Sequence, residues 1–232
     1  MLILHKAAAH KWLIRHKYRA LVKASLLLLL SYPYFNSGPL AEFCFDVTTS
    51  LVLLAAYCCT TNLPQHRVFG LSLFLLAIVG TWWPHGGIGS PAHVAGHLFA
   101  IGFFTLVICS LYADVFSRSN IGTECIFGAI CIYLLIGLNW SMIYVLLESV
   151  LPGSFNLHDV ANLSYGELTA RFIYFSFTTL TTTGYGDITP ATDIARSIVM
   201  LEYGVGVFYL AIMMARLVSA YQPLNHADTQ ED

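Results

Sequence analysis

The sequence predicts an all-α membrane protein with six transmembrane helices. Charged residues make up 10% of the 232 positions and hydrophobic residues 57%, whereas a soluble domain is about 25% charged. Since about 20 apolar residues cross a bilayer, long charge-free stretches indicate several membrane crossings. They exclude an ordinary soluble enzyme, a disordered chain and a protein that binds nucleic acid through a basic surface. Stretches without Asp, Glu, Lys or Arg include 24–41, 47–66, 68–113, 125–147 and 203–215.

The charge-free run 68–113 is too long for one helix, and Pro and Gly residues between Trp82 and Pro91 divide it in two. Lys23 falls within the first expected helix, where its ammonium group can extend to the membrane interface. The first four helices are predicted to form one transmembrane domain, 20–116. In chain order, the six helices are expected at 20–36, 40–60, 68–83, 92–113, 122–148 and 193–220.

The basic residues predict the orientation of these helices. Six lie before the first apolar run, and Arg67, Arg118 and Arg216 lie in alternate connections or at the end of the last helix. With a cytoplasmic amino terminus, these nine residues are inside and only Arg171 and Arg196 are outside. Both termini are therefore expected in the cytoplasm.

Residues 1–19 are expected to form a basic segment at the membrane interface. They are too basic for a cleaved signal, and no small-x-small site follows their apolar run. A positive segment that only fixes the topology is the alternative. Residues 222–232 are predicted to be a short cytoplasmic tail.

The segment between the last two helices, 151–192, is semi-polar and rich in hydroxyl groups. Ser164 with Glu167 three residues later is a capping box, so a short helix is expected to begin here and run to about Thr181. Glycines then alternate with larger residues in Thr-Thr-Gly-Tyr-Gly-Asp, 182–187. Alternating glycines permit positive φ angles, so successive carbonyls can point the same way. A ring of such carbonyls can replace the hydration shell of a monovalent cation. Non-helical backbone is tolerated at membrane depth where it lines an ion path enclosed by protein.

Residues 178–187, Thr-Thr-Leu-Thr-Thr-Thr-Gly-Tyr-Gly-Asp, resemble the signature of potassium channels, and residues 120–221 resemble their pore domain. The resemblance implies that the last two helices flank a re-entrant pore helix and a selectivity filter. Potassium would bind the backbone carbonyls of the filter and one threonine hydroxyl. The implied filter residues are Thr182, which also offers its hydroxyl, Thr183, Gly184, Tyr185 and Gly186, which closes the outer end.

The same resemblance implies supporting residues around the filter. Asp187 would form a hydrogen bond behind it, and Tyr174 and Phe175 would belong to an aromatic cuff that braces it. Two positions differ from the family pattern. Thr183 stands where most members have Val, and Thr178 stands where some have a Glu that pairs with the filter Asp.

The resemblance also implies a function and an assembly. Each chain supplies one loop, so a ring of four requires a homotetramer. The expected protein is not an enzyme: it conducts potassium passively through the plasma membrane, as a bacterial inner-membrane protein. It needs no cofactor, and potassium in the filter is its only metal. Its partners are other copies of itself and the lipid bilayer, with no nucleic acid. Alternatives are a weakly selective monovalent cation channel and the pore subunit of a potassium transporter, although related transporters usually carry four degenerate loops in one chain.

In the last helix, Gly204 and Gly206 lie where family members have a hinge, but glycines also permit close helix packing, and both interpretations stay open. By family alignment, Val207, Leu210 and Met214 would line the inner pore. An apolar lining of this kind can gate by dewetting.

Glu202 is the only acid midway along the last helix, where a charge facing lipid is costly. At 100° per residue it lies away from the predicted pore-lining face and on a stripe with Gly206, Tyr209 and Met213. We therefore expect its carboxyl group behind the pore helix, bonded to Ser176, Thr178 or Thr179, as filter support. A ring of four carboxylates in the inner cavity is the alternative.

The first four helices carry no arginine row. Stretch 92–113 contains no Lys or Arg, which excludes voltage sensing by regularly spaced arginines. Asp46 is an acid within the second helix, where such residues are candidate functional groups, and His85, His93 and His97 are interpreted as a hydrogen-bonding set at the outer helix ends. A proton- or zinc-responsive cluster and a membrane metalloenzyme are the alternatives, the latter without a motif such as His-Glu-x-x-His. The sequence does not identify the stimulus that opens the pore.

Overall fold

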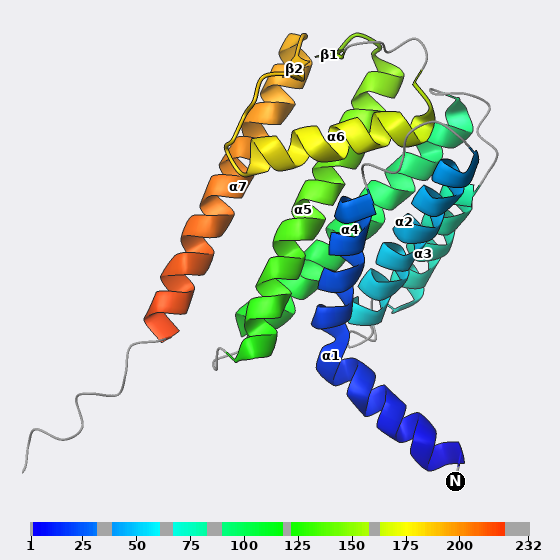
Figure 1. Ribbon diagram of the computed structural model, residues 1–232. Coiled ribbons are helices and arrows are strands. Elements are labelled where there is room, and N and C mark those ends of the chain that lie inside the picture. Colours follow the sequence, from blue (N-terminus) through cyan, green and yellow to red (C-terminus); the bar gives the residue numbers. More distant parts are fainter. Residues whose placement is uncertain are drawn as a thin grey trace, which may run out of the picture.

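The protein is almost entirely helical over the residues that the computed structural model describes (Figure 1), which are 2–31, 39–60, 67–82, 90–117, 122–157 and 163–220. Seven helices and two very short strands occupy these ranges. In chain order they are α1 (Leu2–Ser31), α2 (Pro39–Thr60), α3 (Arg67–Trp82), α4 (Pro91–Ser117), α5 (Thr123–Val150), β1 (Phe155–Asn156), α6 (Tyr165–Leu180), β2 (Thr189–Pro190) and α7 (Asp193–Ala220).

The predicted helix positions are confirmed for α2 to α7 within a few residues. Three helices are long and apolar enough to cross a membrane, at Val94–Ser117, Thr123–Val150 and Asp193–Ser219. The apolar parts of α2 and α3, Phe43–Cys59 and Phe69–Trp82, are shorter. The chain is therefore a membrane protein with three candidate spans among the described residues, and the total of six stays a prediction.

The predicted boundary between an interfacial segment, 1–19, and a first membrane helix that begins at residue 20 stays a prediction. The interfacial segment and the first apolar stretch form one continuous helix, α1, of 30 residues. No Pro or Gly occurs between Leu2 and Ser31, so nothing in the backbone chemistry interrupts the helix. Figure 1 shows the first half of α1 leaning away from the other helices. The last part of the predicted span, 32–36, lies outside the described residues.

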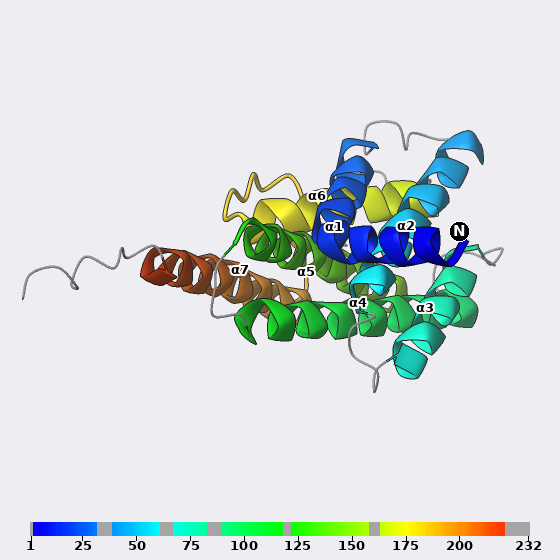
Figure 2. The same cartoon turned by 90° about the horizontal axis from the view of Figure 1, so that it is seen from below.

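The helices pack side by side around a large apolar cluster, and a second, smaller cluster lies between α5, α6 and α7. Helix α4 packs between α3 and α5, and α1 packs on α2 and α5 (Figures 1 and 2). Helices α3 and α4 approach closely at two glycines, since a Cβ atom on Gly80 would lie 2.8 Å from the Cα atom of Gly96. In lipid there is no hydrophobic driving force between helices, and close van der Waals packing holds them together instead. Small residues such as glycine allow that packing because the two backbones can come close. The large cluster continues from α1, α2 and α4 into α5, α6 and α7.

Helix α6 lies across α5 and reaches from α7 towards α2 (Figure 1). Two sets of contacts hold the segments that precede and follow α6 in the chain. Strands β1 and β2 pair antiparallel, with Phe155 opposite Pro190. The buried carboxylate of Glu148 accepts hydrogen bonds from the backbone amides of Gly153 (2.8 Å) and Phe155 (3.1 Å). These contacts hold the segment that follows the end of α5 against the segment that precedes the start of α7.

Candidate functional site

The start of α6 is fixed by the capping box that the sequence predicts. The side chain of Ser164 accepts a hydrogen bond from the amide of Glu167 (3.3 Å), and the Glu167 carboxylate accepts one from the amide of Ser164 (2.9 Å). The helix ends at Leu180 with Thr181 as its carboxyl-terminal cap. Both predicted ends of this helix are confirmed.

Helix α6 presents two different aromatic faces. Phe175 is buried against Tyr144 of α5 and Phe155, with ring centroids 5.2 and 5.5 Å apart. Tyr174 instead stacks on Tyr185 of the following loop, with centroids 6.4 Å apart and rings inclined by 2°. Of the two predicted bracing aromatics, Tyr174 therefore contacts the loop within this chain, whereas Phe175 packs in the core.

The loop 181–187 has an unusual backbone. Thr182, Gly184 and Gly186 have positive φ angles of 60°, 54° and 80°, whereas Thr183 and Tyr185 between them do not. A positive φ is natural for glycine but is an outlier for a β-branched residue. When positive and negative φ angles alternate along the chain, successive peptide groups are turned so that their carbonyls can face the same side. Sequence analysis predicted this freedom for the glycines and missed it for Thr182.

The amide groups of the loop are held by the end of α6. The amide of Thr182 donates to the carbonyl of Thr179 (2.9 Å), and those of Thr183 and Gly184 donate to the carbonyl of Thr178 (2.9 and 3.1 Å). These acceptors are among the last carbonyls of α6, which have no partner inside a helix. Among the described residues, nothing donates to the carbonyls of 182–185. The loop thus turns its amides towards α6 and leaves a row of carbonyls available.

The side chains of the loop are largely open in the single chain. Residues 181–187 are all exposed, and Tyr185 is 72% exposed although it is a large aromatic residue. The hydroxyl groups of Thr181 and Thr183 lie 2.9 Å apart, so the Thr that replaces the usual Val has a partner. Asp187 makes no hydrogen bond with another described residue, and its expected bond behind the filter stays a prediction.

Glu202 lies where the helical stripe predicts it. It is fully buried, and its carboxyl group contacts the hydroxyl of Ser176 on α6 (2.5 Å) and accepts a hydrogen bond from the hydroxyl of Tyr144 on α5. The hydroxyl oxygen of Ser176 also lies 2.8 Å from the carbonyl oxygen of Gly137. The predicted contact with Ser176 is confirmed, and Tyr144 is a partner that sequence analysis missed. A buried tyrosine hydroxyl needs a partner, which is the signal that could have linked it to the buried acid.

The exposure of α7 separates two faces. Val207, Leu210 and Met214, the predicted inner-pore residues, are 48, 45 and 60% exposed. The opposite stripe is buried and repeats every three or four residues, as a helix face does. Its members are Ala195, Val199, Glu202, Gly206, Tyr209 and Met213.

The two glycines of α7 have different surroundings. A Cβ atom on Gly206 would lie 2.6 Å from the carbonyl oxygen of Leu180, at the end of α6, whereas one on Gly204 would meet only Phe208 at 3.8 Å. The geometry therefore favours the packing interpretation for Gly206. It gives no close-packing reason for Gly204.

We expect Gly206→Ala to destabilise the protein by about 1–3 kcal/mol, since overpacking forces backbone shifts. The backbone atom that the new methyl group would meet, the carbonyl of Leu180, belongs to the support of the loop. Thermal unfolding of the purified protein measures the effect, and Gly204→Ala is the matched control, expected within about 0.5 kcal/mol of the parent. Equal stability of the two variants would contradict the packing interpretation.

The histidine group is only partly described. His97 is buried, and its Nε2 atom lies 3.0 Å from the hydroxyl of Tyr165, the first residue of α6. Asp46 is half-buried on α2. His85 and the side chain of His93 lie outside the described residues. Within the described part of the chain, no three His, Cys, Asp or Glu side chains come close enough together to hold a metal ion, so nothing there supports the metalloenzyme alternative.

Comparison with known proteins agrees with this geometry for the carboxyl-terminal part of the chain. No curated protein matches the sequence. Residues 126–222, which include α6, the loop and α7, match the family model described as an ion channel. The match covers less than half of the chain and supports an ion channel domain there.

Proposed function

We propose that four copies of this chain form a channel that conducts potassium passively and selectively across the plasma membrane. The observation that carries the proposal is the alternation of positive φ angles at Thr182, Gly184 and Gly186 in a loop whose amides bond to the end of α6. This backbone allows carbonyls to face one side, as the coordination of a dehydrated monovalent cation requires. The ion channel match over 126–222 supports the same conclusion.

In this proposal the ion sites are formed by the backbone carbonyls of the loop and the hydroxyl of Thr182. Gly186 closes the outer end, while Tyr174, Phe175, Thr178, Asp187 and Glu202 support the filter. One loop surrounds an ion on one side only, so four are needed. The exposed loop and the exposed apolar face of α7 are the surfaces that the other copies and the pore would occupy. Val207, Leu210 and Met214 then face the inner cavity.

The orientation that we propose has both termini in the cytoplasm of a bacterial-type cell. Basic side chains are held at the end of the bundle where α7 ends. Lys17 pairs with Asp114 (3.4 Å), Arg19 pairs with Glu124 (2.9 Å), and Arg216 donates to the carbonyl of Phe116 (3.2 Å). Basic residues favour the cytoplasmic side. No arginine-rich voltage sensor belongs to the proposal.

The experiment that tests the proposal is the zero-current potential of the purified protein in planar bilayers. With KCl on one side and NaCl on the other, we expect currents that reverse close to the potassium equilibrium potential. Bilayers that received detergent alone are the control. Reversal near zero would replace the proposal with a weakly selective cation channel. Absence of current at all voltages would contradict the channel itself.

A further inference from the structure

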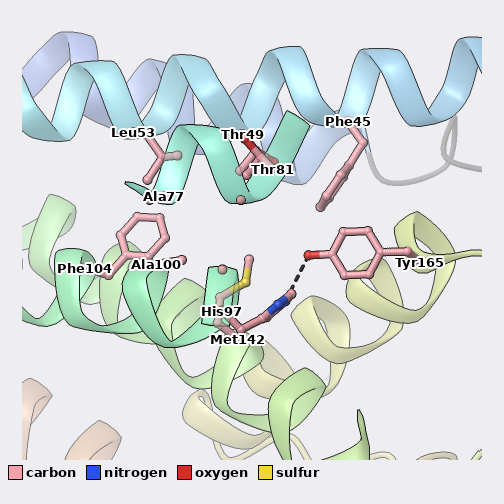
Figure 3. Close-up of a pocket in the computed structure, with 12 residues that line it drawn as sticks. Phe45, Thr49, Leu53, Ala77, Thr81, His97, Ala100, Phe104, Met142 and Tyr165 are labelled. Atoms are coloured by element: carbon pink, nitrogen blue, oxygen red, sulfur yellow. Dashed lines mark hydrogen bonds between the residues drawn. The ribbon is translucent and has the colours of Figure 1, made fainter. Parts of the chain in front are cut away.

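A small cavity lies at the opposite end of α6 from the loop 181–187, between α2, α3, α4, α5 and α6 (Figure 3). Its volume is about 20 Å³, which is room for a single water molecule. Most of its lining is apolar, from residues such as Leu53, Phe104 and Met142. The polar residues that line it are Thr49, Thr81, His97 and Tyr165.

Two of the polar side chains are almost completely buried. His97 is 5% exposed, and Figure 3 shows its ring directed at the Tyr165 hydroxyl, 3.0 Å from Nε2. Thr49 is 4% exposed, and its hydroxyl has no hydrogen-bond partner among the described residues. Thr81, in contrast, donates to the carbonyl of Ile78 (2.8 Å). A buried hydroxyl is stable only with a partner, so the lining fits a water molecule that bridges Thr49 to the His97–Tyr165 pair.

Among the described residues, few charged or titratable groups surround His97. From α6 the group that faces it is Tyr165, and Asp46 on α2 acts electrostatically on Tyr165. Helices α3 and α5 contribute Ala77, Gly80, Thr81 and Met142, none of which titrates. Among the described residues, His97 is therefore the one group of the cavity with an ordinary pKa between pH 5 and 8.

We propose that His97, Tyr165 and Thr49, with one water molecule, form a proton-binding site through which acid loosens the attachment of α6 to α4. The consequence for ion conduction rests on the proposed channel function. The consequence for α6 does not depend on it.

The chemistry of the site gives the direction of the effect. An unprotonated Nε2 atom accepts the hydrogen of the Tyr165 hydroxyl, whereas a doubly protonated imidazole can only donate. Tyr165 must then become the acceptor and turn its own hydrogen to the water molecule. The new positive charge also lies beside the first residue of α6, where the helix dipole is already positive. Asp46 offsets part of this repulsion. The bond between the two side chains reverses its direction, but protonation also places a buried positive charge beside the start of α6, which weakens the attachment there.

Hydrogen exchange of the full chain in lipid nanodiscs tests the site without relying on conduction. After correction for intrinsic rates, the amides in the first turns of α6, 168–171, are expected to exchange about tenfold faster at pH 5.5 than at pH 7.5. His97→Gln keeps an acceptor for Tyr165 but cannot bind a proton, and it should abolish the difference. Tyr165→Phe keeps the ring and should also abolish it. His93→Gln, one turn earlier on α4, is the matched control and should respond like the parent.

Currents in bilayers give the second readout, with pH changed on each side separately. We expect acid to reduce the current about tenfold in the parent and in His93→Gln, and not in His97→Gln. The proposal is overturned if exchange of α6 is the same at both pH values, or if His97→Gln keeps the acid response. The expected exchange result without any ion current would support the proton site and contradict the channel function instead.

Discussion

Gly184→Ala is expected to abolish selective conduction. The φ angle of Gly184 is +54°, and a left-handed backbone costs an L-residue roughly 1–2 kcal/mol. In a ring of four the cost is paid four times, roughly 4–8 kcal/mol in the assembled filter. The added Cβ atom would also lie 3.2 Å from the hydroxyl of Tyr203, which is tighter than ordinary contact. The loop then relaxes to another backbone, and its carbonyls no longer face one side.

The zero-current potential in opposed potassium and sodium solutions measures this loss. Gly204→Ala is the matched control, because it makes the same chemical change on α7 and meets only Phe208 at 3.8 Å. That variant should reverse where the parent does. A Gly184→Ala channel with the selectivity and unitary conductance of the parent would show that the positive φ is not needed for ion coordination.

Local signals in the sequence predicted most of the helical positions and much of the candidate site. Charge-free runs locate helices in a membrane because a charge in lipid is costly. The capping box is also a local signal, because Ser164 and Glu167 form hydrogen bonds with each other's backbone and lie only three residues apart. The side on which Glu202 lies followed from helical periodicity alone, and the contact with Ser176 confirms it.

The features that were missed depend on contacts between distant parts of the chain. A tyrosine within the apolar sequence of α5 signals that its hydroxyl needs a partner, but nothing local identifies that partner as Glu202, 58 residues away. The positive φ of Thr182 opposes the preference of a β-branched residue, and bonds to the end of α6 hold the loop around it. The close approach of Gly206 to the carbonyl of Leu180 is equally invisible before α6 and α7 are packed together.

Glu202 is expected to act through stability rather than through ion attraction. Its carboxyl group joins α5, α6 and α7 through Tyr144 and Ser176, and it is fully buried. Glu202→Ala leaves the hydroxyl of Tyr144 without a partner and opens a cavity behind α6. We expect it to destabilise each chain by about 2–4 kcal/mol and to make the filter inactivate faster.

Glu202→Gln separates this role from that of a carboxylate ring in the inner cavity. A glutamine amide offers an oxygen that accepts from Tyr144 and an NH₂ group that donates to Ser176, whose hydroxyl then donates to the carbonyl of Gly137. The unitary conductance should therefore stay within about twofold of the parent at every salt concentration, whereas removing a charged ring would lower it at low salt and spare it at high salt. Asp193→Asn is the matched control, because Asp193 has a 97% exposed side chain in the first turn of α7 and its loss removes the same charge outside the buried network. A severalfold fall in conductance for Glu202→Gln at low salt, absent in Asp193→Asn and reversed at high salt, would place the carboxylate in the cavity and contradict its position behind α6.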